Sequence, residues 1–85
     1  MQACVLINCN TGCENNVISE FKELSEIVEI NGIWGKYDIF LKISTVDSNR
    51  IEKIVKRLRN HPDVVDTYTM PVLYGQGGTI DTIED

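Results

Sequence analysis

The feature that most constrains the fold is an order of strand-like and helical patterns that occurs twice in succession. In each half of the chain, a run suited to a β-strand is followed by an apolar stripe with helical spacing and then by a second strand-like run. The strand-like runs cover residues 2–9, 26–31, 39–44 and 64–73, and the stripes consist of Val17, Ile18, Phe21 and Leu24 and of Ile51, Ile54, Val55 and Leu58. Such a chain can pair its strands in one sheet and bury both stripes against one face.

We therefore predict an α+β protein with the split βαβ, ferredoxin-like arrangement, in which a four-stranded antiparallel sheet carries two helices on one face. A length of 85 residues suits a single domain. We expect this domain to cover residues 1–74. Residues 75–85 begin glycine-rich and end acidic, and they are expected to form a flexible tail.

The boundaries of the second helix and of the last strand have local signals. Asp47 or Ser48 is a good N-cap, and Pro62 disfavours helical backbone in the residue before it, so the helix should end near residues 60–61. Pro71 has no N–H to donate to a neighbouring strand. We therefore expect it at a sheet edge or a bulge.

A glycine-bracketed turn, residues 32–38, lies between the two halves of the chain. Gly32 and Gly35 tolerate a positive φ, so the chain can reverse here and leave backbone N–H groups uncrowded by side chains. Tyr37 and Asp38 follow at the start of the outgoing strand and place a phenol and a carboxylate beside these amides. Such a turn suits a zwitterionic ligand, because amides bind its carboxylate and Asp38 can pair with its ammonium. The turn residues could instead serve only the hairpin and an interface.

The sheet face opposite the helices is also predicted to be apolar. Alternation places Cys4, Leu6, Phe40, Tyr68 and Met70 on this face, where no helix covers them. An uncovered apolar patch usually marks an interface. We predict a homo-oligomer in which two sheets pack face to face.

Charge and composition narrow the function classes. A net charge of −5 and a pI of 4.7 argue against nucleic-acid binding by this chain alone. Residues 50–59 carry five basic side chains against one acidic side chain, which is typical of a solvated helix face or, alternatively, of a docking surface for an acidic partner. Three cysteines without a signal-like start, and the absence of an apolar run near the length of a membrane span, favour a soluble cytoplasmic protein with reduced thiols.

The turn and its surroundings resemble one known family. Gly35-Lys36-Tyr37-Asp38 is similar to the G-x-Y-D turn of the Lrp/AsnC effector-binding domain, also called the RAM domain. The order of the flanking segments agrees, from the Phe21-Lys22-Glu23-Leu24 helix end to Val64-Val65-Asp66-Thr67-Tyr68-Thr69. The resemblance covers roughly residues 3–74. Family members usually carry an N-terminal helix-turn-helix domain, which this sequence lacks, so a stand-alone or excised effector domain is expected.

The resemblance implies a module that senses an amino acid and is linked to transcription regulation, with sites between dimers in a ring-shaped assembly. Gly35, Lys36 and Tyr37 match the turn whose backbone contacts the ligand, and Asp38 matches its acidic position. Thr67 and Thr69 match positions of the last strand that line the same pocket. We expect no cofactor. Because the helix-turn-helix domain is absent and the chain is acidic and lacks a long apolar run, we also expect no direct contact with nucleic acid or membrane. Full-length Lrp/AsnC regulators are possible partners.

Three other functions were weighed against this one. A zinc site using the cysteines and His61 is disfavoured, because Cys4 and Cys9 are an odd number of residues apart and point to opposite faces of a strand. A small dimeric enzyme of this fold lacks an evident catalytic set, since His61 is expected to be a surface turn residue without a nucleophile beside it. A structural role, assembly with full-length regulators without a ligand, stays open.

Overall fold

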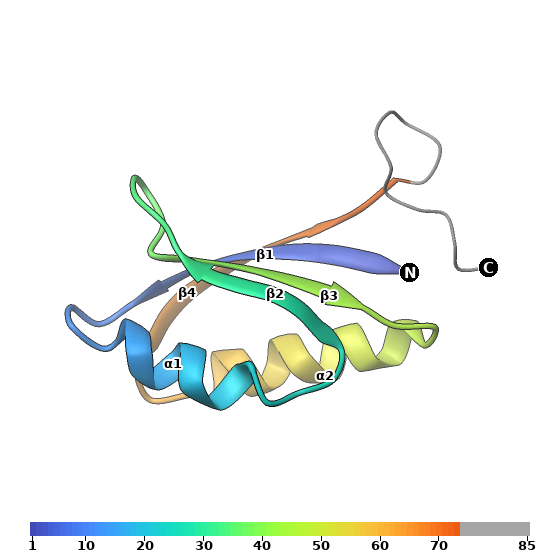
Figure 1. The fold of residues 1–85 in the computed structure, drawn as a ribbon, viewed down its shortest axis with the longest axis horizontal. Helices are drawn as coiled ribbons and strands as arrows, with labels where there is room; N and C mark the ends of the chain where they lie inside the picture. The colour runs from blue at the N-terminus through green and yellow to red at the C-terminus, as the bar shows by residue number, and fades with distance from the viewer. Residues whose placement is uncertain (74–85) are drawn as a thin grey trace.

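The computed structural model describes residues 1–73, so the predicted tail, residues 75–85, lies outside the described residues. The elements along the chain are β1 (Gln2–Cys9), α1 (Glu14–Phe21), β2 (Ile27–Gly32), β3 (Ile39–Ser44), α2 (Ser48–Arg59) and β4 (Val64–Pro71). The strands form one antiparallel sheet in the order β2-β3-β1-β4, and both helices cover the same face of it (Figure 1). The predicted α+β, ferredoxin-like βαββαβ fold is therefore confirmed.

The core lies between this sheet and the two helices. The central strands β1 and β3 alternate strictly between buried and partly buried residues, and their buried side supplies most of the core. Each helix adds one stripe of apolar side chains to this core. The fully or almost fully buried side chains from all four elements are Ala3, Val5, Ile7, Val17, Phe21, Ile39, Leu41, Ile43, Ile54 and Leu58. The apolar sides of the strands and of the helices, which the sequence periodicities predicted, thus pack against each other in one core.

The first helix is shorter than the apolar stripe predicted. It ends at Phe21, and Leu24 lies in the following turn, where its N–H donates to the Phe21 carbonyl at 3.1 Å. Leu24 nevertheless packs against the core. The stripe therefore continues past the helix end, because a turn can keep an apolar side chain on the same side as the helix.

The second helix begins and ends where its signals predicted. Asp47 is the N-cap, and its side chain accepts a hydrogen bond from the Asn49 N–H at 2.9 Å. Three basic residues lie in the last turn, where the helix dipole favours cations. The helix ends at Arg59 with Asn60 as C-cap, two residues before Pro62. Both predicted boundaries are confirmed.

The last strand lies at the edge of the sheet, as Pro71 suggested. Only β1 pairs with β4, and Pro71, opposite Ala3, is its final residue. The strand is two residues shorter than predicted, although the Val72 N–H still donates to the Gln2 carbonyl at 3.0 Å. A register shift next to Cys9 marks the other end of this pairing.

Candidate functional site

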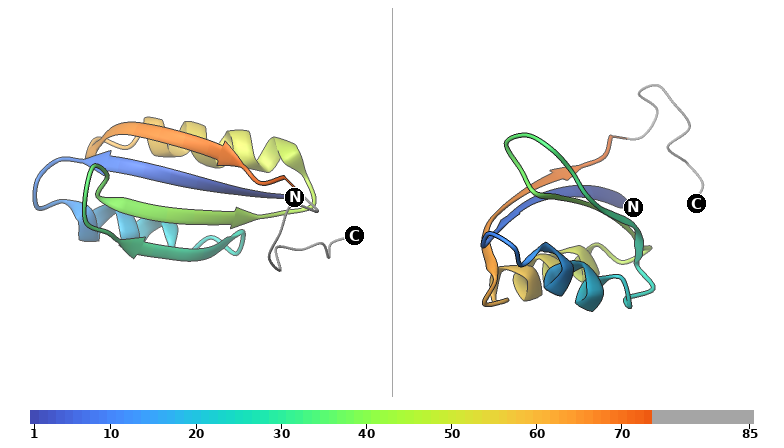
Figure 2. Two further views of the ribbon diagram at one scale, coloured as in Figure 1. Left: turned by 90° about the horizontal axis from the view of Figure 1, so that it is seen from above. Right: turned by 60° about the vertical axis from the view of Figure 1, so that its left-hand side comes forward.

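The loop between β2 and β3, residues 33–38, rises over the sheet face that the helices leave uncovered (Figure 2). Gly35 has a φ of +112°, a conformation that side-chain-bearing residues rarely adopt. Gly32 instead ends β2 opposite Ile39 without a positive φ, so the reversal depends on Gly35. The Ile33 N–H donates to the Asp38 carbonyl at 2.9 Å and closes the base of the loop.

Four successive amides in this loop are available to a ligand. Among residues 1–73, the N–H groups of Trp34, Gly35, Lys36 and Tyr37 donate to no protein acceptor. The backbone around Gly35 is also uncrowded, since a Cβ built there meets no atom within 4 Å. Successive unpaired amides of this kind form concavities that favour anions.

Asp38 ties the loop to the first strand. Its N–H donates to the Ile7 carbonyl at 2.9 Å, and its carboxylate Oδ2 accepts from the Cys9 N–H at 3.0 Å. The carboxylate therefore caps the end of β1 through this oxygen. Cys9 N was not foreseen as its partner, because pairing between β1 and the loop cannot be read from local sequence.

Tyr37 points toward the uncovered face of the sheet. Its ring stacks on that of Tyr68, with centroids 6.5 Å apart and an interplanar angle of 15°. Tyr68 belongs to β4 and lies opposite Leu6 of β1, and its side chain is 53% exposed. The stack links the loop to the edge strand across the uncovered face.

The two predicted threonines lie on the other side of the sheet. Thr67 and Thr69 are opposite Ile7 and Val5, whose side chains are in the core, so they face the helices. Arg59 of α2 donates from Nε to Thr67 Oγ1 at 3.4 Å, a contact the sequence did not indicate. Within one chain, the structure therefore brings Gly35, Lys36, Tyr37 and Asp38 together and places Thr67 and Thr69 apart from them.

The uncovered face has the composition that alternation predicted. One row across the sheet places Leu6 between Phe40 and Tyr68, and the next row places Cys4 between Lys42 and Met70. All five predicted residues, Cys4, Leu6, Phe40, Tyr68 and Met70, share this face. Lys42 is the one charged residue that β1 and β3 contribute to it, and Glu29 of β2 lies opposite.

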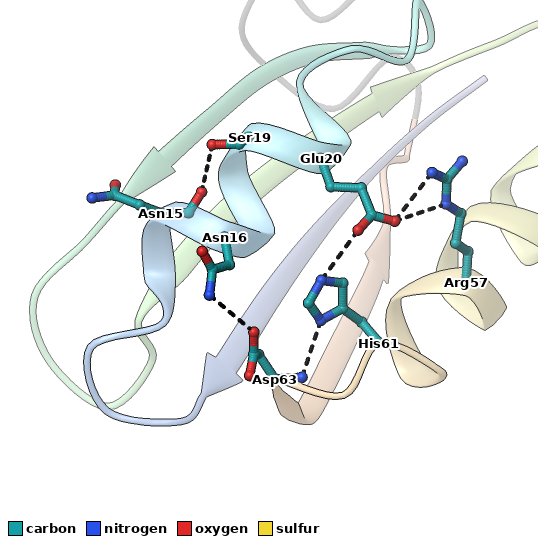
Figure 3. A network of polar contacts seen from close by, with 7 residues as sticks. All are labelled: Asn15, Asn16, Ser19, Glu20, Arg57, His61 and Asp63. Carbon is teal, nitrogen blue, oxygen red and sulfur yellow. Dashed lines mark hydrogen bonds and ion pairs between the residues drawn. The ribbon is translucent and has the colours of Figure 1, made fainter.

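A polar network on the helix side joins α1, α2 and the turn before β4 (Figure 3). Glu20 accepts from Arg57 at 3.2 and 3.1 Å, and its other oxygen lies 3.2 Å from His61 Nε2. His61 Nδ1 accepts from the Asp63 N–H at 3.0 Å, which assigns the ring proton to Nε2, toward Glu20. The His61 side chain is only 9% exposed, so the expectation of a surface residue was wrong.

The thiols near this network are poor nucleophiles. Burial, then the charges of Glu14 and Asp38, raises the pKa of Cys9 to about 11. Burial and then a hydrogen bond with Asp63 also raise the pKa of Cys13. Since the thiolate is the reactive form, both cysteines are protonated at neutral pH.

Cys4 lies on the partly exposed side of β1 and Cys9 on the buried side, so the two thiols diverge as the odd spacing predicted. No cluster of three or more potential metal ligands occurs within residues 1–73. In the same part of the chain, neither helix has the length and apolar character required to cross a membrane.

Comparison with known proteins gives consistent relatives. The sequence profile of the Lrp/AsnC ligand binding domain matches residues 2–75. The HTH-type transcriptional regulator FL11 of Pyrococcus horikoshii is 33% identical over 73 residues, which cover 86% of this chain and 48% of the regulator. The chain thus spans about half the length of the curated relatives it matches.

Solved structures share the fold. The crystal structure of FFRP-DM1 superposes with a TM-score of 0.79 at 25% identity, covering 85% of this chain and 97% of that one. The transcriptional regulator NMB0573 of Neisseria meningitidis, solved in complex with L-Met, gives 0.78 at 20% identity, covering 93% of this chain and 53% of that one. With a family profile matched over almost all of its described length, the chain belongs to the Lrp/AsnC ligand binding domain family.

Proposed function

We propose that this domain binds a small-molecule effector, of the amino-acid class, at the loop between β2 and β3 and thereby serves transcription regulation. The observation that carries the proposal is the run of four unpaired amides from Trp34 to Tyr37, which includes Gly35 and Lys36 and precedes Asp38. Membership of a ligand-binding family supports it, as does the L-Met complex of NMB0573. Binding, rather than catalysis, is the proposed activity, and the cytoplasm is its proposed location.

The chemistry of an amino acid fits these groups. Its carboxylate can accept hydrogen bonds from the loop amides, and the positive φ of Gly35 directs them without a Cβ in the way. Its ammonium can donate to Asp38 Oδ1, because Oδ2 already accepts from Cys9. Donors and an acceptor thus lie a few residues apart on one loop.

We further propose that the complete site is formed by more than one chain. Tyr37 lies over the uncovered face, and that face is apolar along Leu6, Phe40 and Met70. Packing two such faces together places the loop beside a second copy. Since Thr67 and Thr69 face the helices of their own chain, they can join the loop only across a contact between chains, as in a ring of dimers.

A structural role is the second candidate, and two contacts favour it. The Asp38 carboxylate caps β1, and Tyr37 stacks on Tyr68, so both side chains have functions without a ligand. In this case the domain assembles with full-length Lrp/AsnC regulators and alters their state through the uncovered face alone. Neither proposal includes direct DNA binding, because a net charge of −5 disfavours contact with the phosphate backbone.

A thermal-shift screen against the twenty amino acids tests the proposed function. At one hundred times its dissociation constant, a ligand stabilises the folded state by about 2.7 kcal/mol. Asp38→Asn should abolish this shift, because it removes the charge while keeping an oxygen that can accept from the Cys9 N–H. Asp63→Asn, on the helix side, is the matched control and should respond as the unmodified protein does. Stabilisation by none of the amino acids would favour the structural role.

A further inference from the structure

Helix α2 runs alongside the edge strand β4 (Figure 2). Open cavities lie between the two elements and continue onto the solvent side of α2. One cavity, of about 400 Å³, is lined by Ile51, Glu52, Val55, Lys56, Arg59 and Thr69. A smaller cavity of about 280 Å³ continues it past Lys56 to Lys53. We name this surface the α2–β4 groove. The half-buried Ile51 and Val55 give it an apolar wall, and its rim carries three cations (Lys53, Lys56 and Arg59) together with the carboxylates of Asp47 and Glu52.

The cations at this rim differ from the other two basic residues of the helix. Arg50 pairs with Glu26 at 2.8 Å and Arg57 pairs with Glu20 at 3.1 Å. Lys53, Lys56 and Arg59 have no carboxylate within ion-pair distance among residues 1–73, and their spacing of three places them along one side of α2. The groove is therefore apolar at its wall, and at its rim three cations without an ion-pair partner among residues 1–73 outnumber the two carboxylates of Asp47 and Glu52.

The chain contains one segment with the complementary pattern. Residues 79–85 read Thr-Ile-Asp-Thr-Ile-Glu-Asp, with two isoleucines three residues apart and three carboxylates around them. The apolar pair suits the apolar wall of the groove, and the three carboxylates suit the three cations that have no ion-pair partner among residues 1–73. This complementarity selects residues 79–85 as the occupant.

The connection to the groove is long enough. Pro71 at the end of β4 lies opposite Ala3, and Ser44, four residues before α2 begins, lies opposite Gln2. The end of β4 and the start of α2 are thus at the same end of the sheet. Six residues, three of them glycines, lie between Leu73 and Ile80, and the seven Cα–Cα steps span up to about 24 Å. The helix from Ile51 to Arg59 is only about 12 Å long.

We propose that residues 79–85 bind in the α2–β4 groove of their own chain. Ile80 and Ile83 lie against the apolar wall, and the three carboxylates lie beside the three cations of the rim. The basic face of α2 is then an internal docking site, neutralised by the acidic end of the same chain.

Carbodiimide coupling of the full chain, which joins an amine to a carboxylate in direct contact, tests this proposal. Peptide mass spectrometry should find Lys53 and Lys56 joined to Asp81, Glu84 or Asp85. Lys22, Lys36 and Lys42 are internal controls and should join to these carboxylates much less often. Equal coupling to all five lysines, or no coupling to residues 81–85, would overturn the proposal.

Two further experiments distinguish binding in the groove from charge attraction alone and from binding to the groove of another chain. Ile80→Ser/Ile83→Ser keeps every amine and carboxylate, so a several-fold drop in coupling to Lys53 and Lys56 is expected only if the apolar wall is used. An unchanged yield would refute binding in the groove. A mixture of ¹⁵N-labelled and unlabelled protein should give linked peptides with a single isotope, and pairs of mixed isotope would refute binding within one chain.

Discussion

The two faces of the sheet are built from alternate residues of the same strands, but only one of them is covered. On the helix side, Val5, Ile7 and Leu41 are fully buried. On the other side Leu6 and Phe40 are only partly buried, and Tyr68 is 53% exposed. Since the second side of β1 carries the apolar Cys4 and Leu6 between Gln2 and Asn8, both sides of the strand favour cover, and one chain covers only the helix side. One chain therefore closes its own core but leaves the second face of the sheet exposed, and we infer that a second copy covers this face.

The largest effect we predict comes from neighbouring residues on opposite faces. Ile7→Ala should lower the free energy of unfolding by about 2–5 kcal/mol at every protein concentration, because it opens a cavity in a closed core. Leu6→Ala should matter chiefly at high concentration, where a partner covers that face. Denaturant unfolding of both variants at two protein concentrations measures this difference. An effect of Leu6→Ala that does not depend on protein concentration would contradict the proposed difference between the two faces.

An intermediate effect is expected at the loop on the uncovered side. Gly35→Ala should destabilise by about 1–3 kcal/mol, because a φ of +112° is strained for alanine although space for the methyl group exists. Gly32→Ala is the matched control, since its added Cβ would meet the Asp38 carbonyl oxygen at an ordinary 3.9 Å and its φ is not positive. Equal unfolding midpoints for the two variants would show that the loop does not depend on Gly35.

The smallest effect concerns pH and the helix side. Arg50 donates to Glu26 at 2.8 Å, and this hydrogen bond lowers the pKa of Glu26 below its ordinary 4.5. A carboxyl group with a lowered pKa stabilises the folded state above its unfolded pKa, and this contribution is lost as the pH falls through the lowered value. Glu26→Gln should therefore lose less Tm than the unmodified protein on acidification below about pH 5.

Glu29→Gln, on the adjoining strand, is the control for this pH series. Glu29 accepts a hydrogen bond from Asn31 at 3.3 Å and has no ion pair among residues 1–73. Its Tm should fall with acidification as steeply as that of the unmodified protein. Indistinguishable slopes for the two variants would mean that the Arg50–Glu26 pair contributes nothing to acid sensitivity.

The fold could be predicted because its signals are local and periodic. Alternation in β1 and β3 assigned the two faces, and Asp47 and Pro62 marked the limits of α2. The end of α1 was missed because Leu24 keeps the apolar stripe going in a turn. Periodicity reports which side a residue faces and not whether its backbone stays helical.

The contacts of the candidate site were less predictable because they join residues far apart in sequence. Asp38 accepts from Cys9, and Thr67 from Arg59, and neither partner is marked by spacing. The face of Thr67 and Thr69 followed only once the register with Val5 and Ile7 was fixed. His61 is covered because Glu20 and Phe21 of α1 pack near it, a helix-to-turn contact that no local pattern encodes.

The contrast between the two faces is tested most directly by the molecular mass in solution. Light scattering at micromolar concentration should give the unmodified protein at least twice the single-chain mass of 9.6 kDa. Phe40→Asp, which places a charge at the centre of the uncovered face, should reduce the mass to that of one chain while leaving the circular dichroism spectrum unchanged. A single-chain mass for the unmodified protein across this range would contradict the account.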